Sequence, residues 1–119
     1  MKSHKNLVVW QKSIELVTDI YSLTKDYPKE ELFGLSSQMR RASISIPSNI
    51  AEGSARNHNK EFIQFLYVSL GSCAELETQL IISMKLGLIK SETFDIFCIK
   101  IKDVRNMLIG LIKSVKNKK

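Results

Sequence analysis

Two adjacent arginines, Arg40 and Arg41, are the residues of this sequence best suited to hold an anion. A guanidinium presents its N–H donors as a fork that matches a carboxylate or a phosphate, and it stays charged at physiological pH. The arginines open the segment RRASISIPSNIAEG, which also contains three serines, Pro47 and Asn49. A helix needs none of these polar residues or the proline in order to fold. The segment therefore has a role beyond helix propensity.

Two interpretations of the arginines stay open at this point. If the chain folds back near residues 56–57, Arg40 lies opposite residues 72–74, within one helical turn of Glu75. The favoured interpretation is a partly buried ion pair that joins two helices and fixes their register. The alternative is that Arg40 and Arg41 bind a phosphate.

Signals for catalysis are weak. His4 and His58 stand in predicted loops or helix ends, and no Cys/His cluster has the spacing of a metal site. Glu75 and Glu77 are two residues apart, so they project from different faces of a helix and make a poor catalytic pair. We expect no enzyme, and no cofactor, metal or small-molecule substrate.

Apolar residues at steps of three and four predict four helices joined by short turns. The expected ranges are about Asn6 to Tyr27, Leu35 to Gly53, Asn57 or Asn59 to Leu86, and Ser91 to the C-terminus. Pro28 ends the first helix, and Gly87 closes the third. Short turns make consecutive helices antiparallel, so the sequence predicts an all-α, up-down-up-down antiparallel four-helix bundle. Residues 1–119 form a single domain.

Two positions in the second helix are unusual. Pro47 removes one backbone hydrogen bond, so the helix either breaks or kinks there. The apolar seam stays in phase on both sides of Pro47, and we expect a kink. Gly53 is predicted to end the helix in a left-handed conformation.

The first helix carries two apolar stripes. The predicted core seam consists of Trp10, Ile14, Val17 and Tyr21. The apolar residues away from the predicted core are Val9, Leu16, Ile20, Leu23 and Tyr27, with Ile44, Ile96 and Ile99 on later helices. One bundle cannot bury all of these, and uncovered apolar patches mark interfaces. The sequence therefore predicts a homo-oligomer.

Composition restricts location and partners. No apolar run approaches the ~20 residues that cross a bilayer, and the N-terminal apolar run is too short for a signal peptide. We expect a cytoplasmic protein without a membrane role. Cys73 and Cys98 lie among apolar neighbours and are predicted to be free thiols.

The net charge of +6 is concentrated at one end of the predicted bundle. This end, here called the basic pole, collects Lys2, Lys5, Arg56, Lys60, Lys113, Lys116, Lys118 and Lys119 against Glu52 and Glu61. The opposite end has four lysines against five acids. A basic face attracts nucleic acid phosphates with an affinity that falls steeply with salt. No aromatic residue is predicted at the basic pole, which argues against base stacking.

The string FGLSSQMRRASISIPSNIAEGSAR, followed by EFIQFLYVSLGSCAELETQL, resembles the bacterial four-helix-bundle proteins named for the 23S ribosomal RNA intervening sequence. That family is related to the accessory protein of diversity-generating retroelements, a basic pentameric barrel that binds nucleic acid and a reverse transcriptase. The resemblance implies an up-down bundle and a homopentamer, and it implies little about biochemistry. The motif positions are Arg40, Arg41, Pro47, Asn49, Glu52, Gly53, Glu75 and Glu77.

Two functions therefore remain open. The first is a non-enzymatic bundle that self-associates and binds RNA or DNA without sequence specificity through the basic pole. The alternative is a protein–protein interaction adaptor for which the charge is incidental.

Overall fold

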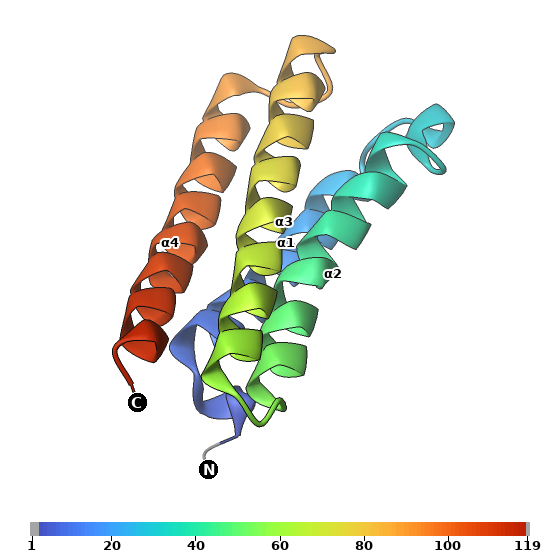
Figure 1. The fold of residues 1–119 in the computed structure, drawn as a ribbon. Coiled ribbons are helices and arrows are strands. Elements are labelled where there is room, and N and C mark those ends of the chain that lie inside the picture. The colour runs from blue at the N-terminus through green and yellow to red at the C-terminus, as the bar shows by residue number, and fades with distance from the viewer. Residues whose placement is uncertain (1–2, 119) are drawn as a thin grey trace.

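The computed structural model describes residues 3–118, which form four helices joined by short turns. The helices are α1 (Val8–Thr24), α2 (Leu35–Ser54), α3 (Asn59–Lys85) and α4 (Ser91–Lys116), with short 3₁₀ helices η1 (His4–Asn6) and η2 (Lys29–Glu31). Helices that follow one another along the chain run in opposite directions (Figure 1). The predicted all-α, up-down-up-down four-helix bundle is confirmed, and the described residues contain no strand.

Gly87 closes α3 as predicted. Its φ of 75° is the only positive φ among residues 3–118, and glycine adopts it without a steric penalty. The amide of Leu88 donates to the carbonyl of Ser83 (2.9 Å), and the amide of Gly87 donates to that of Met84 (3.0 Å). These bonds satisfy the last carbonyls of the helix and turn the chain into α4.

The core lies along the whole length of the bundle. Its largest fully buried side chains include Leu16, Ile20, Met39, Ile46, Ile50, Leu66, Leu76, Leu80, Ile101 and Leu108. α3 and α4 each bury one apolar stripe, with Leu66, Leu76 and Leu80 on α3 and Ile101 and Leu108 on α4, while Phe62 and Leu111 are partly buried.

The predicted core face of α1 is wrong. Leu16 and Ile20, from the stripe predicted to lie outside, are buried, whereas Ile14 and Tyr21 remain 38% and 40% exposed. Both stripes have helical spacing, so periodicity alone could not choose between them. The buried face also includes Ser13 and Thr24. Their hydroxyls donate to backbone carbonyls of the same helix, so these polar groups are hydrogen-bonded although they are buried.

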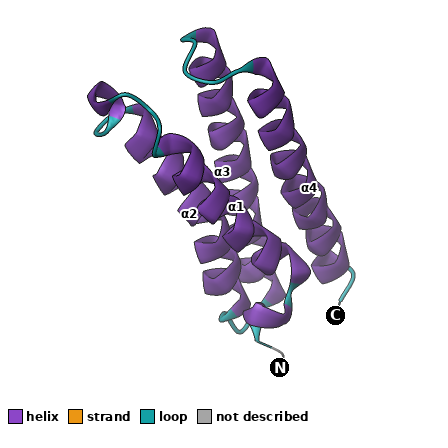
Figure 2. Cartoon of the chain, turned by 180° about the vertical axis from the view of Figure 1, so that it is seen from behind, coloured by secondary structure: helices purple, strands orange, loops and turns teal. Residues whose placement is uncertain are grey.

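The four helices do not pack equally. α2 and α3 form the most extensive pair and α1 and α4 the least extensive. The molecule is elongated, with extents of 48 × 24 × 20 Å. Figure 2 shows that the turn between α1 and α2 lies apart from the turn between α3 and α4 at the same end of the bundle.

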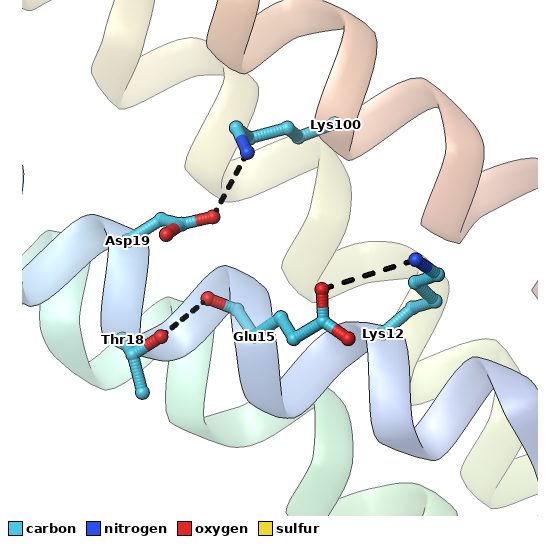
Figure 3. Close-up of polar contacts among 5 residues, drawn as sticks. All are labelled: Lys12, Glu15, Thr18, Asp19 and Lys100. Atoms are coloured by element: carbon cyan, nitrogen blue, oxygen red, sulfur yellow. Dashed lines mark hydrogen bonds and ion pairs between the residues drawn. The ribbon is translucent and has the colours of Figure 1, made fainter.

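Polar contacts on the surface link α1 to α4. The Nζ of Lys100 on α4 lies 3.0 Å from the Oδ2 of Asp19 on α1, and both side chains are about 40% exposed (Figure 3). The adjacent pair Lys12–Glu15 lies within α1 at 3.8 Å. A shallow groove of about 180 Å³ runs between the two helices at these residues.

Both cysteines are free thiols, as predicted. Cys73 is buried on α3, and burial raises the pKa of its thiol to about 12. Cys98 is partly buried on α4, where burial, with help from the charges of Glu77 and Asp95, also raises its pKa.

Candidate nucleic-acid interface

Short polar side chains of both helices hold α2 against α3. The Ser69 hydroxyl on α3 donates to the buried carbonyl of Ile46 (2.9 Å), and the Ser72 hydroxyl donates to the Ser45 hydroxyl (2.8 Å). The side-chain amide of Asn49 donates to the carbonyl and the hydroxyl of Ser45 at 2.8 and 3.0 Å. Such short side chains let two helix backbones approach closely while their polar atoms stay paired. Ser45 and Asn49 of α2 therefore belong to the polar network at this helix contact.

Gly53 is a packing residue, and its predicted left-handed conformation is wrong. It lies within α2, is buried, and has no positive φ. A Cβ atom at this position would lie 2.7 Å from the Cβ of Phe65 and 2.9 Å from the Cδ1 of Phe62. The start of α3 therefore crosses α2 at a point where only glycine fits.

Pro47 lies inside an unbroken helix. α2 continues from Leu35 to Ser54, so the alternative in which the helix breaks at Pro47 is wrong. Pro47 is buried. The kink stays a prediction.

The predicted ion pair of Arg40 or Arg41 with Glu75 is wrong. Among residues 3–118, no ion pair includes any of the three. The Nε of Arg40 instead donates to the Thr24 hydroxyl of α1 (2.9 Å), and its guanidinium lies 4.5 Å from the centre of the Tyr21 ring.

The direction of these contacts explains the error. Arg40 lies on the side of α2 that contacts α1, so it points away from Glu75 on α3. Arg41 and Glu75 are exposed, and Glu77 is partly buried. The Nε of Arg40 is engaged with α1, and the alternative in which Arg40 and Arg41 bind a phosphate stays a prediction.

The basic pole is formed as the topology predicted. η1, the turn between α2 and α3, and the end of α4 lie at one end of the bundle (Figure 1). The described cations at this end are all exposed: Lys5, Arg56, Lys60, Lys113, Lys116 and Lys118. Lys2 and Lys119 lie outside the described residues. Against Glu52 and Glu61, the six described cations leave an excess of four positive charges.

Two of these cations, Arg56 and Lys116, lie on aromatic rings. Arg56 forms an ion pair with Glu52 (2.9 Å) and lies 4.9 Å from the centre of the Phe65 ring. Lys116 donates to the hydroxyl of Tyr67 (3.0 Å), and Tyr67 is 48% exposed. The expectation that the pole lacks aromatic residues is therefore wrong, because α3 brings its rings alongside the end of α4.

A large cleft opens at the same pole, with a volume of about 510 Å³. Three separate stretches of the chain line it: residues 3–7 around η1, residues 54–62 from the end of α2 to the start of α3, and residues 111–118 at the end of α4. Because these segments are distant in sequence, no local motif indicated the cleft. Residues 3–118 hold no group of three or more His, Cys, Asp or Glu side chains placed to share a metal ion.

The model of the 23S rRNA-intervening sequence protein family matches residues 5–110. The chain belongs to this family. It is also similar to a solved structure from Bacteroides thetaiotaomicron, described as a protein with unknown function from the S23 ribosomal protein family. The two are 27% identical with a TM-score of 0.80, and the match covers 89% of this chain and 99% of that one.

No curated protein sequence matches the chain. None of the described helices has the length and hydropathy that crossing a bilayer requires. Membership of the family agrees with the fold, and it assigns no chemistry to the motif residues.

Proposed function

We propose that this protein is a self-associating helical bundle that binds RNA or DNA through its basic pole, without sequence specificity. The observation that carries the proposal is the charge distribution: six exposed cations from three stretches of the chain lie at one end, against two acids. The opposite end has four lysines and five acids. A field of this polarity orients a polyanion toward one end of the molecule.

Self-association rests on a second observation. One apolar stripe of α1 is not part of the bundle core. It lies beside apolar residues of α2, and together they form an apolar face. Its members are Trp10, Ile14, Val17 and Ile44, around a shallow pocket of about 280 Å³ that Pro47 and Ala51 complete. We infer that a second copy packs on this face, and the family resemblance favours a pentamer. In a ring of parallel subunits the basic poles would combine into one basic face.

The test of binding is a salt titration with single-stranded RNA. Replacing Lys113, Lys116 and Lys118 with Ser leaves the core residues of α4 unchanged, so the fold is retained. Each phosphate contact contributes about 0.7 to the slope of log affinity against log salt for a single strand, so the slope should become shallower by about two. Affinity for all sequences should fall together.

The matched control replaces Lys25, Lys29 and Lys85 with Ser at the opposite pole. It removes the same charge and should change binding little. Equal weakening by both sets would contradict an oriented basic pole. Absence of saturable binding by the unmodified protein near physiological salt would favour the adaptor function.

The test of self-association uses light scattering at micromolar protein. Ile14→Glu together with Ile44→Glu should lower the mass to that of a monomer, because the apolar face must lose water on association. Leu86→Glu, at a residue just after α3 that is 61% exposed and belongs to neither apolar stripe, is the control. A monomeric mass for the unmodified protein would reject the proposal.

A further inference from the structure

The lining of the cleft at the basic pole has three parts: apolar side chains, neutral polar side chains and cations. The apolar part consists of Leu7, Phe62, Leu111 and Val115, from η1's flank, α3 and α4. Val115 is buried and the other three are partly buried. Because a volume of about 510 Å³ lies within the usual range of small-molecule pockets, the cleft has room for a flat organic ring.

The polar part carries unused hydrogen-bonding groups. The side chains of Asn57 and Asn59 line the cleft, are exposed, and make no hydrogen bond within residues 3–118. Each amide offers both donors and an acceptor, which is the complement of the edge of a nucleobase. His4 lies on the same lining, with its ring 5.1 Å from that of Trp10 in an edge-to-face contact.

Cations lie beside these groups. Arg56 and Lys118 both line the cleft, and Lys118 has no ion-pair partner among residues 3–118. A phosphate alone would use the cations and leave the apolar part in contact with water. An apolar ligand would leave the cations and amides unused. A nucleotide uses all three parts of the cleft.

We propose that the cleft receives one unstacked nucleobase of a bound single strand, while the flanking phosphates lie on the cations of the basic pole. This inference rests on the proposed nucleic-acid binding and deepens it. The base packs on the apolar part, around the Phe62 ring, and its edge meets the amides of Asn57 and Asn59. Every base has an apolar face, so the cleft adds affinity without strong sequence preference.

The test fills the cleft without changing charge. Ser54 at the end of α2 lines the cleft and is partly buried, so Ser54→Trp places an indole in the space meant for the base. Ser114→Trp on α4 is the matched control, because Ser114 is exposed and does not line the cleft. The probes are oligouridylate, oligoadenylate and inorganic polyphosphate, which carries the charge without bases.

For Ser54→Trp we expect a loss of about ten- to hundredfold in affinity for both oligonucleotides, the scale of one stacked base. Affinity for polyphosphate should be unchanged, and so should the salt slope, because no phosphate contact is removed. Ser114→Trp should bind all three probes as the unmodified protein does.

A second variant keeps the inference testable if Ser54→Trp fails to fold. Asn57→Ala with Asn59→Ala changes only exposed side chains and should weaken the oligonucleotides several-fold while sparing polyphosphate. Unchanged oligonucleotide affinity, or equal losses for oligonucleotide and polyphosphate, would overturn the base-binding cleft while leaving the basic pole intact. Failure of the unmodified protein to bind any probe would instead reject the proposed function itself.

Discussion

The α2–α3 interface and the α1–α4 contact join helices of the same bundle by opposite means. α2 meets α3 through short neutral residues, with the buried hydroxyl of Ser69 bonded to the carbonyl of Ile46 and with Gly53 under the phenylalanines of α3. At the surface, α1 is joined to α4 by a charged pair, Lys100 and Asp19, beside an open groove (Figure 3).

The two contacts differ in how strongly they determine the packing of the helices and in how they respond to salt. A buried neutral hydrogen bond is insensitive to salt, and its loss leaves an unpaired polar group in the core. An exposed ion pair is screened by salt and contributes little to the free energy of unfolding. Gly53 and the Ser69–Ile46 hydrogen bond therefore fix how α2 and α3 pack, whereas the α1–α4 ion pair can break with little loss of stability.

The largest expected effect comes from adding one methyl group at the α2–α3 crossing. Gly53→Ala forces the new Cβ against Phe65 and Phe62 at under 3 Å, so α2 and α3 must move apart. We expect the free energy of unfolding to fall by about 1–3 kcal/mol, measured by denaturant titration at fixed protein concentration.

Gly71→Ala is the matched control for this substitution. Gly71 lies exposed in the middle of α3, and a Cβ atom added there would meet nothing within 4 Å. Alanine should therefore stabilise the helix by about 0.5–1 kcal/mol. Destabilisation of similar size at both glycines would contradict a close crossing at Gly53.

Removing a hydroxyl from the same interface should have a smaller effect. Ser69→Ala deletes the buried bond to the Ile46 carbonyl, and we expect a loss of about 1 kcal/mol in the free energy of unfolding. The loss should be the same at low and high salt, because the group is neutral. Ser114→Ala, at an exposed serine of α4, should change stability by less than about 0.5 kcal/mol.

The α1–α4 contact is tested by a double-mutant cycle. Asp19→Asn and Lys100→Gln should show a coupling energy of about 0.2–1 kcal/mol at low salt, which disappears as salt is raised. Thermal unfolding of the four proteins at two salt concentrations measures it. A coupling that persists at high salt would make this contact resemble the buried α2–α3 interface.

The smallest expected effect is the coupling of Arg40 with Glu75. Because Arg40 contacts Thr24 and Tyr21 on α1, Arg40→Ala and Glu75→Ala should be additive within about 0.5 kcal/mol. Denaturant titration of the two single variants and the double variant gives the free energies of unfolding that test additivity. A larger coupling would mean that charge also joins α2 to α3.

The sequence predicted the fold well because each of α3 and α4 has one dominant apolar stripe. It failed for α1, where two stripes of equal apolar character compete and only packing against the other helices buries Leu16 and Ile20. It failed for Gly53, since a glycine near a helix end is compatible both with a left-handed cap and with a close crossing.

The candidate site was predictable only in part. The basic pole follows from topology and charge, which the sequence contains. The cleft requires side chains from three distant stretches of the chain, among them Leu7, Phe62 and Val115, whose apolar character alone indicates only a core. The direction of Arg40 likewise depends on the rotation of α2 about its own axis, which helical spacing does not determine.

The reactivity of the Cys73 thiol can be used to measure how often the buried core opens. The thiolate is the form that attacks thiol reagents. Burial raises the pKa of Cys73 to about 12 and leaves it 1% exposed, so its thiol reacts only while α3 is separated from its neighbours. With reagent in excess, the labelling rate of Cys73 therefore reports how often the bundle opens. Cys98, less buried on α4, reports smaller local openings in the same sample. The two native thiols therefore report global and local opening of the bundle without an introduced probe.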